Sequence, residues 1–136
     1  MDAKQEKAEA FALRIINLHK YLCNNGDYVM SKQILRSGTS IGANIAEAKF
    51  AESRDDMIHK LAISLKEASE TKYWLVILFK GGFIGEREYI SIAQDCEELI
   101  KLLISVINNS SLIFFESKIH AVKHTHLIDF QQNKWQ

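Results

Sequence analysis

Three stretches of the chain carry apolar residues that alternate steps of three and four positions, and this spacing constrains the fold more than any other feature. Such steps keep one stripe of apolar side chains on one face of an α-helix, as in helical bundles. The chain contains no proline, the residue that most often breaks a helix. The stripes consist of Ala8, Phe11, Ile15, Leu18 and Leu22, of Ile34, Gly38, Ile41, Ile45 and Ala48, and of Tyr89, Ile92, Cys96, Leu99, Leu103 and Val106.

A further helix is predicted between the second and third stripes, where the same rhythm holds with one exception. Its apolar positions are Ile58, Leu61, Leu65, Ala68, Leu75 and Phe79. Lys72 occupies the position where another apolar residue is expected. The aliphatic stem of a lysine can lie along an apolar stripe while its ammonium group reaches water. We therefore include this segment among the helices of the bundle.

Turn residues separate the four predicted helices. Residues 24–27 (Asn-Asn-Gly-Asp) end the first, Ser53 caps the third, residues 81–85 end it, and residues 108–111 (Asn-Asn-Ser-Ser) close the fourth. Because the connections are short and the helices similar in length, neighbouring helices should run antiparallel. The sequence thus predicts an all-α fold, an antiparallel up-down-up-down four-helix bundle over residues 1–110.

Residues 111–136 differ in character and are predicted to form a C-terminal extension, partly disordered or a short helix. The segment contains three histidines, His120, His124 and His126, which invite comparison with a zinc site. Nothing in the sequence supplies a general base or a defined pocket beside them. We interpret them as solvated side chains and predict no metal and no cofactor.

The charge balance limits the classes of partner. Lysine and arginine number 17 and aspartate and glutamate also number 17, so the formal net charge is zero. A general nucleic-acid binder usually carries an excess of positive charge, so only a local basic patch is left open. No apolar run approaches the roughly 20 residues that cross a bilayer, and the first residues lack the apolar core of a signal peptide. We expect a cytoplasmic protein with no membrane partner.

Two glycines within the second helix need an explanation, because each costs about 1 kcal/mol relative to alanine in a helix interior. Gly38 and Gly42 lie four positions apart and share one face. A phosphate-binding loop would require a preceding strand and a lysine at the helix start, and both are missing. The spacing favours close packing of another helix against this face.

Polar residues accompany the glycines. Asn44 and Glu47 lie three positions apart on one face of the same helix. They form either a solvated flank or a specific contact with another helix or subunit, since a single buried asparagine can set register and oligomeric state. Trp74 lies next to the stripe residue Leu75, so we expect it to face outward and mark an interface.

No arrangement of residues predicts catalysis. The sequence has neither a Gly-x-Ser-x-Gly elbow nor a cysteine framed by glycines. Asp56 and His59 approximate the Glu-x-x-His spacing of di-iron bundles, but the pair occurs once and with aspartate. We predict a protein that is not an enzyme and has no small-molecule substrate.

Cations occur on the second helix and at the start of the third, interspersed with acids. They represent either ordinary surface solvation or a basic strip offered to nucleic acid. The residues that we select as candidate RNA contacts are Lys32, Arg36, Lys49 and Arg54.

Three segments carry a resemblance to a known family: Ser31–Ala48, Ala51–Asp56 and Lys66–Leu75. Over residues 8–107 the chain resembles the 23S rRNA-intervening sequence proteins, bacterial four-helix bundles that are often labelled ribosomal proteins. The resemblance implies a closed four-helix bundle and, for several members, a ring-shaped homopentamer. Accessory proteins of diversity-generating retroelements have a similar fold and engage nucleic acid through a basic surface.

The resemblance brings no catalytic residues. It implies a homo-oligomeric binding or scaffold protein whose partner is RNA or a nucleoprotein. The alternative is a protein–protein interaction module with no nucleic-acid role. This chain departs from the family pattern in its zero net charge and in the segment after Ser110.

Overall fold

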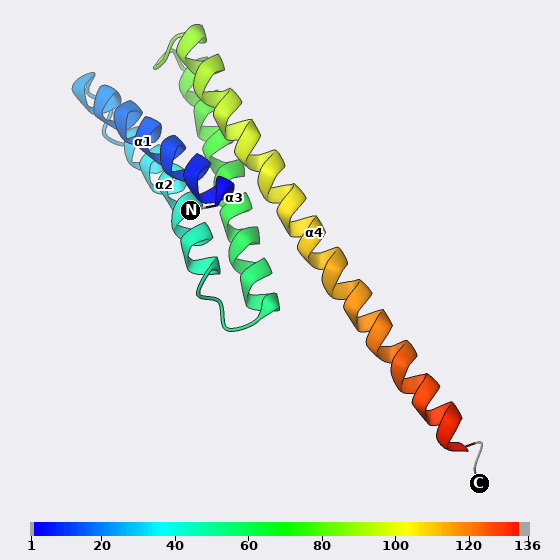
Figure 1. Cartoon of the computed structure of the whole chain (residues 1–136). Coiled ribbons are helices and arrows are strands. Elements are labelled where there is room, and N and C mark those ends of the chain that lie inside the picture. The colour runs from blue at the N-terminus through cyan, green and yellow to red at the C-terminus, as the bar shows by residue number, and fades with distance from the viewer. Residues whose placement is uncertain (1, 134–136) are drawn as a thin grey trace.

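The computed structural model describes the backbone of residues 2–133 and the side chains of residues 2–110 and of His120. Over these residues it contains four helices: α1 (Ala3–Asn24), α2 (Met30–Ala48), α3 (Arg54–Lys80) and α4 (Glu86–Asn133). Each helix lies beside the next in the chain, and α4 also contacts α1 (Figure 1). The predicted all-α, up-down-up-down four-helix bundle is confirmed.

Side-chain caps fix where α1 and α3 begin. The Asp2 carboxylate accepts a hydrogen bond from the backbone amide of Gln5 at 2.8 Å, and this bond holds the pKa of Asp2 below its usual value. The Ser53 hydroxyl accepts from the amide of Asp56 at 3.1 Å, as the sequence predicts. Each cap satisfies an amide that has no partner within the helix.

Two glycines with positive φ end α1 and α3. Gly26 has φ of 84° after α1, and Gly82 has φ of 80° after α3. Residues with a Cβ rarely adopt such angles, so glycine allows the chain to reverse there. The amide of Phe83 then donates to the carbonyl of Leu78 at 2.9 Å and closes the end of α3. Both helix ends lie where the sequence predicts.

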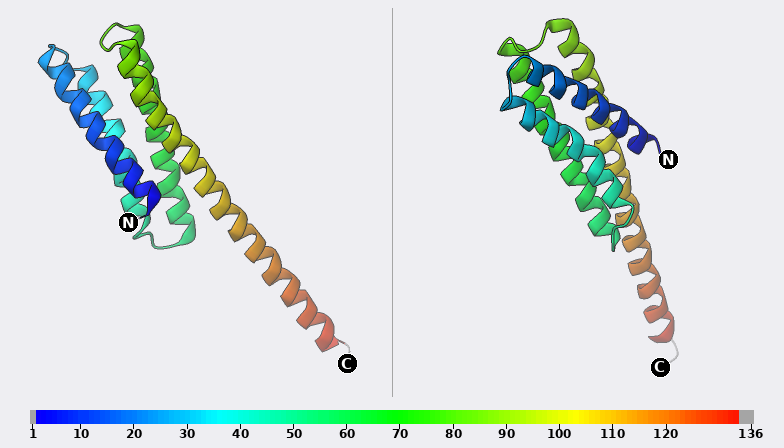
Figure 2. Two further views of the ribbon diagram at one scale, coloured as in Figure 1. Left: turned by 45° about the horizontal axis from the view of Figure 1, so that its top comes forward. Right: turned by 90° about the vertical axis from the view of Figure 1, so that its left-hand side faces the viewer.

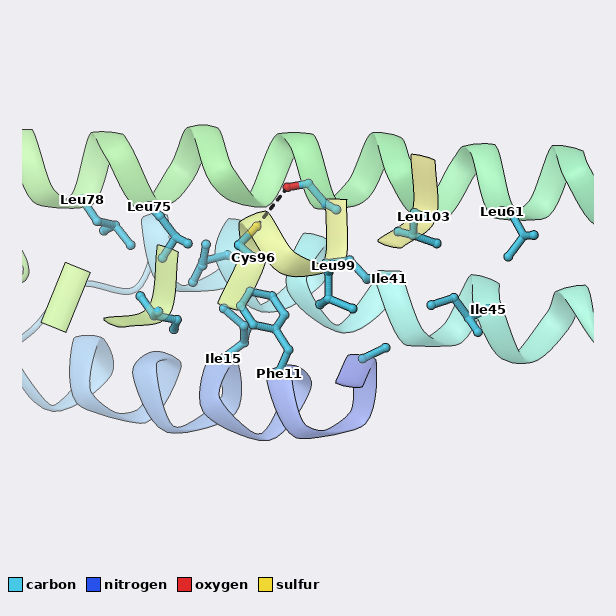
Figure 3. Packing of buried hydrophobic residues seen from close by; sticks show 14 of the residues in the cluster. Phe11, Ile15, Ile41, Ile45, Leu61, Leu75, Leu78, Cys96, Leu99 and Leu103 are labelled. Atoms are coloured by element: carbon cyan, nitrogen blue, oxygen red, sulfur yellow. Dashed lines mark hydrogen bonds between the residues drawn. The ribbon is translucent and has the colours of Figure 1, made fainter. Parts of the chain in front are cut away.

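The apolar stripes of all four helices meet in one core (Figure 3). The core includes Phe11 and Ile15 of α1, Ile41 and Ile45 of α2, Leu61, Leu75 and Leu78 of α3, and Cys96, Leu99 and Leu103 of α4. Leu18, Leu65, Phe79, Tyr89 and Val106 are only partly buried and pack at its edges.

The stripe on α3 differs from the prediction at three positions, where Ser64, Thr71 and Leu78 are buried in place of Leu65, Lys72 and Phe79. Thr71 is fully buried, whereas Lys72 is exposed and forms an ion pair with Glu97 of α4. Hydrogen bonding to Glu97 raises the pKa of the Lys72 ammonium. The hydroxyl of Thr71 shares a hydrogen bond of 2.9 Å with that of Ser37 on α2, so a polar residue is satisfied inside the core.

The fourth helix does not end near Ser110, and that expectation is wrong. α4 runs as one helix from Glu86 to Asn133, beyond the ends of the other three helices (Figure 2). Asparagine and serine are poor helix formers but do not stop a helix as proline does. The sequence contains neither glycine nor proline after Gly85. The division into a bundle of residues 1–110 and an extension of residues 111–136 stays a prediction, and residues 134–136 lie outside the described residues.

The two glycines of α2 lie where α1 approaches most closely. A Cβ added to Gly38 would lie 2.7 and 2.8 Å from the two γ-carbons of Ile15. A Cβ added to Gly42 would lie 3.4 Å from the Cβ of Ala8, an ordinary van der Waals distance. The side chain of Gln5 also donates to the carbonyl of Gly42 at 3.3 Å. The absence of a side chain at Gly38 therefore lets Ile15 reach the core.

Gly38→Ala should destabilise the protein, because the added methyl group overlaps the stiff, β-branched side chain of Ile15. Overpacking of this kind costs about 1–3 kcal/mol. Gly42→Ala is the matched control, and it should be neutral or stabilising by up to about 1 kcal/mol through helix propensity. Urea denaturation of both variants measures the difference. Equal unfolding free energies for the two variants would contradict the assigned contact.

Burial of the Cys96 thiol predicts a pH-dependent contribution to stability. Its Sγ donates to the carbonyl of Ala68 at 3.3 Å, and burial raises its pKa from 9.0 to about 12. Above pH 9 the unfolded chain loses this proton while the folded chain keeps it. The unfolding free energy should therefore fall by about 1.4 kcal/mol per pH unit until the folded thiol also ionises. Denaturation of wild type and Cys96→Ala between pH 8 and pH 10.5 isolates this slope, which the variant should lack.

Candidate nucleic-acid and subunit interfaces

The four cations predicted to contact RNA lie near the two ends of α2 and do not form one patch. Lys32 and Arg36 lie in its first two turns, whereas Lys49 and Arg54 flank the turn between α2 and α3. All four side chains are exposed. At 1.5 Å per residue, Lys32 and Lys49 are about 25 Å apart along the helix. A single chain therefore presents two separate pairs of cations.

Arg36 takes part in the contact between α2 and α3. Its guanidinium group forms ion pairs with Glu67, at 3.2 Å, and with Glu70. These groups are partly exposed, so each pair contributes no more than about 1 kcal/mol to stability. Two carboxylates facing one cation leave the local surface with a net negative charge. The guanidinium group of Arg36 is therefore a poor contact for a phosphate group.

The remaining three cations differ in their surroundings. The ammonium group of Lys49 lies 3.9 Å from the carboxylate of Asp2 at the start of α1. Lys32 and Arg54 form no ion pair with any other residue among those described. No carboxylate among the described residues competes with a ligand for these two side chains.

Asn44 and Glu47 contact different partners rather than each other. The side-chain amide of Asn44 donates to the carbonyl of Ser40, one turn earlier, at 2.9 Å. The carboxylate of Glu47 accepts from Lys60 of α3 at 3.0 Å, and this hydrogen bond raises the pKa of Lys60. Both contacts lie within one chain. The role of these residues in a subunit contact stays a prediction.

Tyr73, rather than Trp74, occupies the outward position on α3. Trp74 is half-buried and packs against the core, one turn from the buried residues Thr71 and Leu78. The two aromatic rings meet edge to face with centroids 5.1 Å apart. The Tyr73 side chain is 56% exposed. A surface contact on this helix would therefore involve the tyrosine.

Several large apolar side chains lie on the surface, away from the stripes that form the core. The exposure of Leu13 and Ile90 can be recognised from their spacing in the sequence. Each lies two positions from a buried residue and so points to the opposite side of its helix. The exposed set is Leu13, Tyr21, Tyr28, Val29, Phe50, Tyr73, Phe83, Ile90 and Ile104. They are spread over α1, α3, α4 and the turns between the helices, and exposed apolar side chains of this size are typical of protein interaction sites where they form a contiguous patch.

A groove of about 510 Å³ lies between the second half of α1 and the start of α4. Arg14 crosses it, donating to the backbone carbonyl of Ser91 at 3.2 Å and to Asp95 at 2.5 Å. Its remaining lining is mostly apolar and includes Leu18, Tyr21, Ile84 and Ile92. Because the guanidinium group is already paired, the groove offers no unpaired cation for an anionic ligand.

Cys23 and His19 lie together at the end of α1. The Nδ1 atom of His19 is 3.0 Å from the carbonyl of Ser31, which places the ring proton on that nitrogen. The Nε2 atom is then free to accept, and the Cys23 sulfur lies 3.7 Å away. These contacts tie the end of α1 to the first turn of α2. Both cysteines of the chain are unbridged.

Among the described residues, no three side chains of histidine, cysteine, aspartate or glutamate lie close enough together to hold a metal ion. None of the described helices combines the length and the apolar content that crossing a membrane requires.

Comparisons with known proteins place these features in context. Residues 4–105 match the family model described as 23S rRNA-intervening sequence protein. The chain is also similar to a crystal structure of a protein of unknown function from the S23 ribosomal protein family of Bacteroides thetaiotaomicron. The two are 56% identical with a TM-score of 0.76, and the match covers 77% of this chain and 98% of the other. No curated protein matches the chain.

Proposed function

Because the chain belongs to the 23S rRNA-intervening sequence protein family, we propose that it is a non-enzymatic binding protein that assembles with copies of itself and engages RNA or a nucleoprotein. The related Bacteroides protein is of unknown function, so the proposal rests on the surface of this chain. The observation that carries it is the set of large apolar side chains exposed away from the core.

Self-association follows from the distribution of these side chains. Leu13, Tyr73 and Ile90 are 64%, 56% and 56% exposed, and they lie on three different helices. Covering them with a second copy of the chain would remove apolar surface from water, the main driving force for association. The homopentamer implied by the family resemblance is one assembly that would achieve this.

Assembly also bears on the RNA part of the proposal. In one chain, Lys32 and Arg54 are isolated cations without an ion pair among the described residues. A symmetric assembly repeats each of them once per subunit, so that equal charges recur at regular intervals around its axis. Several weak phosphate contacts can then act together on one RNA molecule. Assembly compensates in this way for the zero net charge of the chain.

A protein–protein interaction module without a nucleic-acid role is the second candidate function. The ion pairs of Arg36 with Glu67 and Glu70 favour it, because they neutralise one of the predicted RNA contacts. A partner protein recovered in stable complex, and retained after nuclease treatment, would support this alternative.

RNA binding is tested by charge reversal. Lys32→Glu/Arg54→Glu should weaken binding of a fluorescently labelled structured RNA, measured by anisotropy at 50 mM salt, about tenfold through lost phosphate contacts. Arg87→Glu is the matched control, an exposed cation at the start of α4, and should leave affinity within about twofold. The wild-type affinity should also fall steeply at 200 mM salt. No binding by the wild type at 50 mM salt would refute the RNA function.

The oligomeric state has its own test. Light scattering coupled to gel filtration at micromolar concentration should give a multiple of the 15.6 kDa chain mass, and five times that mass for the pentamer. A species of one chain mass across this concentration range would refute self-association.

A further inference from the structure

Two exposed surfaces of the bundle lie on α1 and on α3 with α4, and α1 and α3 run in the same direction. The first, called here the α1 face, consists of Glu6, Glu9 and Leu13 on the side of α1 that points away from the core. The second, called the α3–α4 face, consists of Lys66 and Tyr73 of α3 with Ile90 and Lys101 of α4. All of these side chains are exposed.

The α1 face points away from the bundle because of helix geometry. Leu13 lies two positions from both Phe11 and Ile15, which are buried, and so projects from the opposite side of α1. Glu6 lies seven positions earlier, almost directly in line with it. The two side chains therefore form a short outward row, with the acid nearer to the start of the helix.

The α3–α4 face has the same origin. Tyr73 lies two positions from the buried Thr71 and Leu75, and Ile90 lies two positions before the buried Ile92. Lys66 precedes Tyr73 by seven positions, so the two form an outward row along α3. On both faces an apolar side chain and a charged one are separated by about 10 Å along the axis.

Contacts inside the bundle show that the two rows lie at similar heights. On the α1 side, Lys7 pairs with Glu98 at 3.3 Å and Arg14 pairs with Asp95 at 2.5 Å. Leu13 therefore lies at about the level of the α4 residues that precede Glu98 by one turn. Each position on α1 can thus be assigned a level on α4.

Contacts between α3 and α4 place the residues of α3 along the same axis. Cys96 bonds to the carbonyl of Ala68, and the rings of Phe79 and Tyr89 stack with centroids 4.6 Å apart. Because the positions of α1 and of α3 are both related to α4, Tyr73 can be placed at about the level of Leu13 along the bundle axis. Seven residues earlier on each helix, Lys66 and Glu6 also share a level.

The charges on the two rows are opposite and uncompensated. Among the described residues, neither Glu6 nor Glu9 has an ion-pair partner, and neither does Lys66 or Lys101. A second copy placed beside the first, with its helices in the same direction, would bring the acidic side chains of one copy next to the basic side chains of the other. The apolar side chains of the two copies would meet at matching heights. Opposite charges at matching positions favour this register over its inverted alternative.

We propose that the α1 face of one copy packs against the α3–α4 face of a second copy, with the two bundles parallel. Leu13 then meets Tyr73, and Glu6 meets Lys66. The inference rests on the self-association part of the proposed function and names the surfaces that carry it. Helix α1, with 22 residues and a width of about 10 Å, presents roughly 330 Å² to a neighbour. This is small beside the roughly 800 Å² per partner of a standard interface, so the proposal is supported by the matched charges and apolar side chains rather than by area.

The contact is heterologous, because it joins two different surfaces. Each copy in a pair still has one uncovered face, so further copies add until the rotation between neighbours closes a ring. One position in the register is unfavourable. Lys20 follows Leu13 by seven residues and Lys80 follows Tyr73 by seven, so two cations occupy the same level. This pair should limit the affinity of the contact.

A charge exchange tests the register. Glu6→Lys and Lys66→Glu should each weaken assembly about tenfold, measured by sedimentation velocity over a concentration series, since an attraction becomes a repulsion. The double variant Glu6→Lys/Lys66→Glu restores opposite charges and should recover assembly. Leu13→Asp should weaken assembly at least as much as either single reversal. Circular dichroism confirms that each variant is folded.

A control variant and a variant that should strengthen assembly complete the test. Phe50→Ser removes the most exposed apolar side chain, at 88%, from the α2–α3 turn outside both faces, and should leave assembly unchanged. Lys20→Glu should strengthen assembly a few-fold by pairing with Lys80. Wild-type assembly that is indifferent to Glu6→Lys, Lys66→Glu and Leu13→Asp would overturn this interface while leaving self-association intact. A wild-type protein that stays monomeric would overturn both.

Discussion

The close approach of α1 to α2 at Gly38 is the constraint on which the rest of the structure depends. Without a Cβ at this position, Ile15 reaches the core, whereas the contact of Gly42 with Ala8, one turn away, would also leave room for a Cβ. α1 makes its least extensive contact with α4, so its position is determined mainly by α2. Once Ile15 points inward, Leu13 must point outward. The glycine therefore decides which side of α1 faces solvent.

Much of this architecture can be predicted from the sequence, because helix periodicity and turn chemistry are local. The stripes identify nearly all of the core, and Gly26 and Gly82 end helices where a left-handed residue is needed. The prediction is wrong where no residue strongly favours or forbids a helix. Residues 108–111 lower helix propensity without forbidding a helix, so α4 continues through them. On α3, Thr71 rather than Lys72 occupies the buried position, because the hydroxyl group of Thr71 has a hydrogen-bond partner on α2.

The candidate sites could be predicted less well, because ion pairing joins residues that are distant in the sequence. Lys32 and Arg36 look equivalent in the sequence, yet only Arg36 faces carboxylates, 31 and 34 positions away. Similarly, Tyr73 and Trp74 are adjacent, and the direction of each depends on how α3 is rotated against α2. The exposed positions of Leu13, Tyr73 and Ile90 were detectable in principle, since each lies two positions from a buried residue. Their meaning emerges only when the heights of different helices are compared.

The length of α4 has a mechanical consequence. The family match ends at residue 105, whereas the helix continues to Asn133, about 40 Å further at 1.5 Å per residue. A continuous helix transmits direction, so this segment acts as a semi-rigid lever fixed at one end in the bundle. If neighbouring bundles are parallel, every lever leaves the assembly on the same side. Their ends are then held at a high effective concentration, in the millimolar range typical of tethered groups.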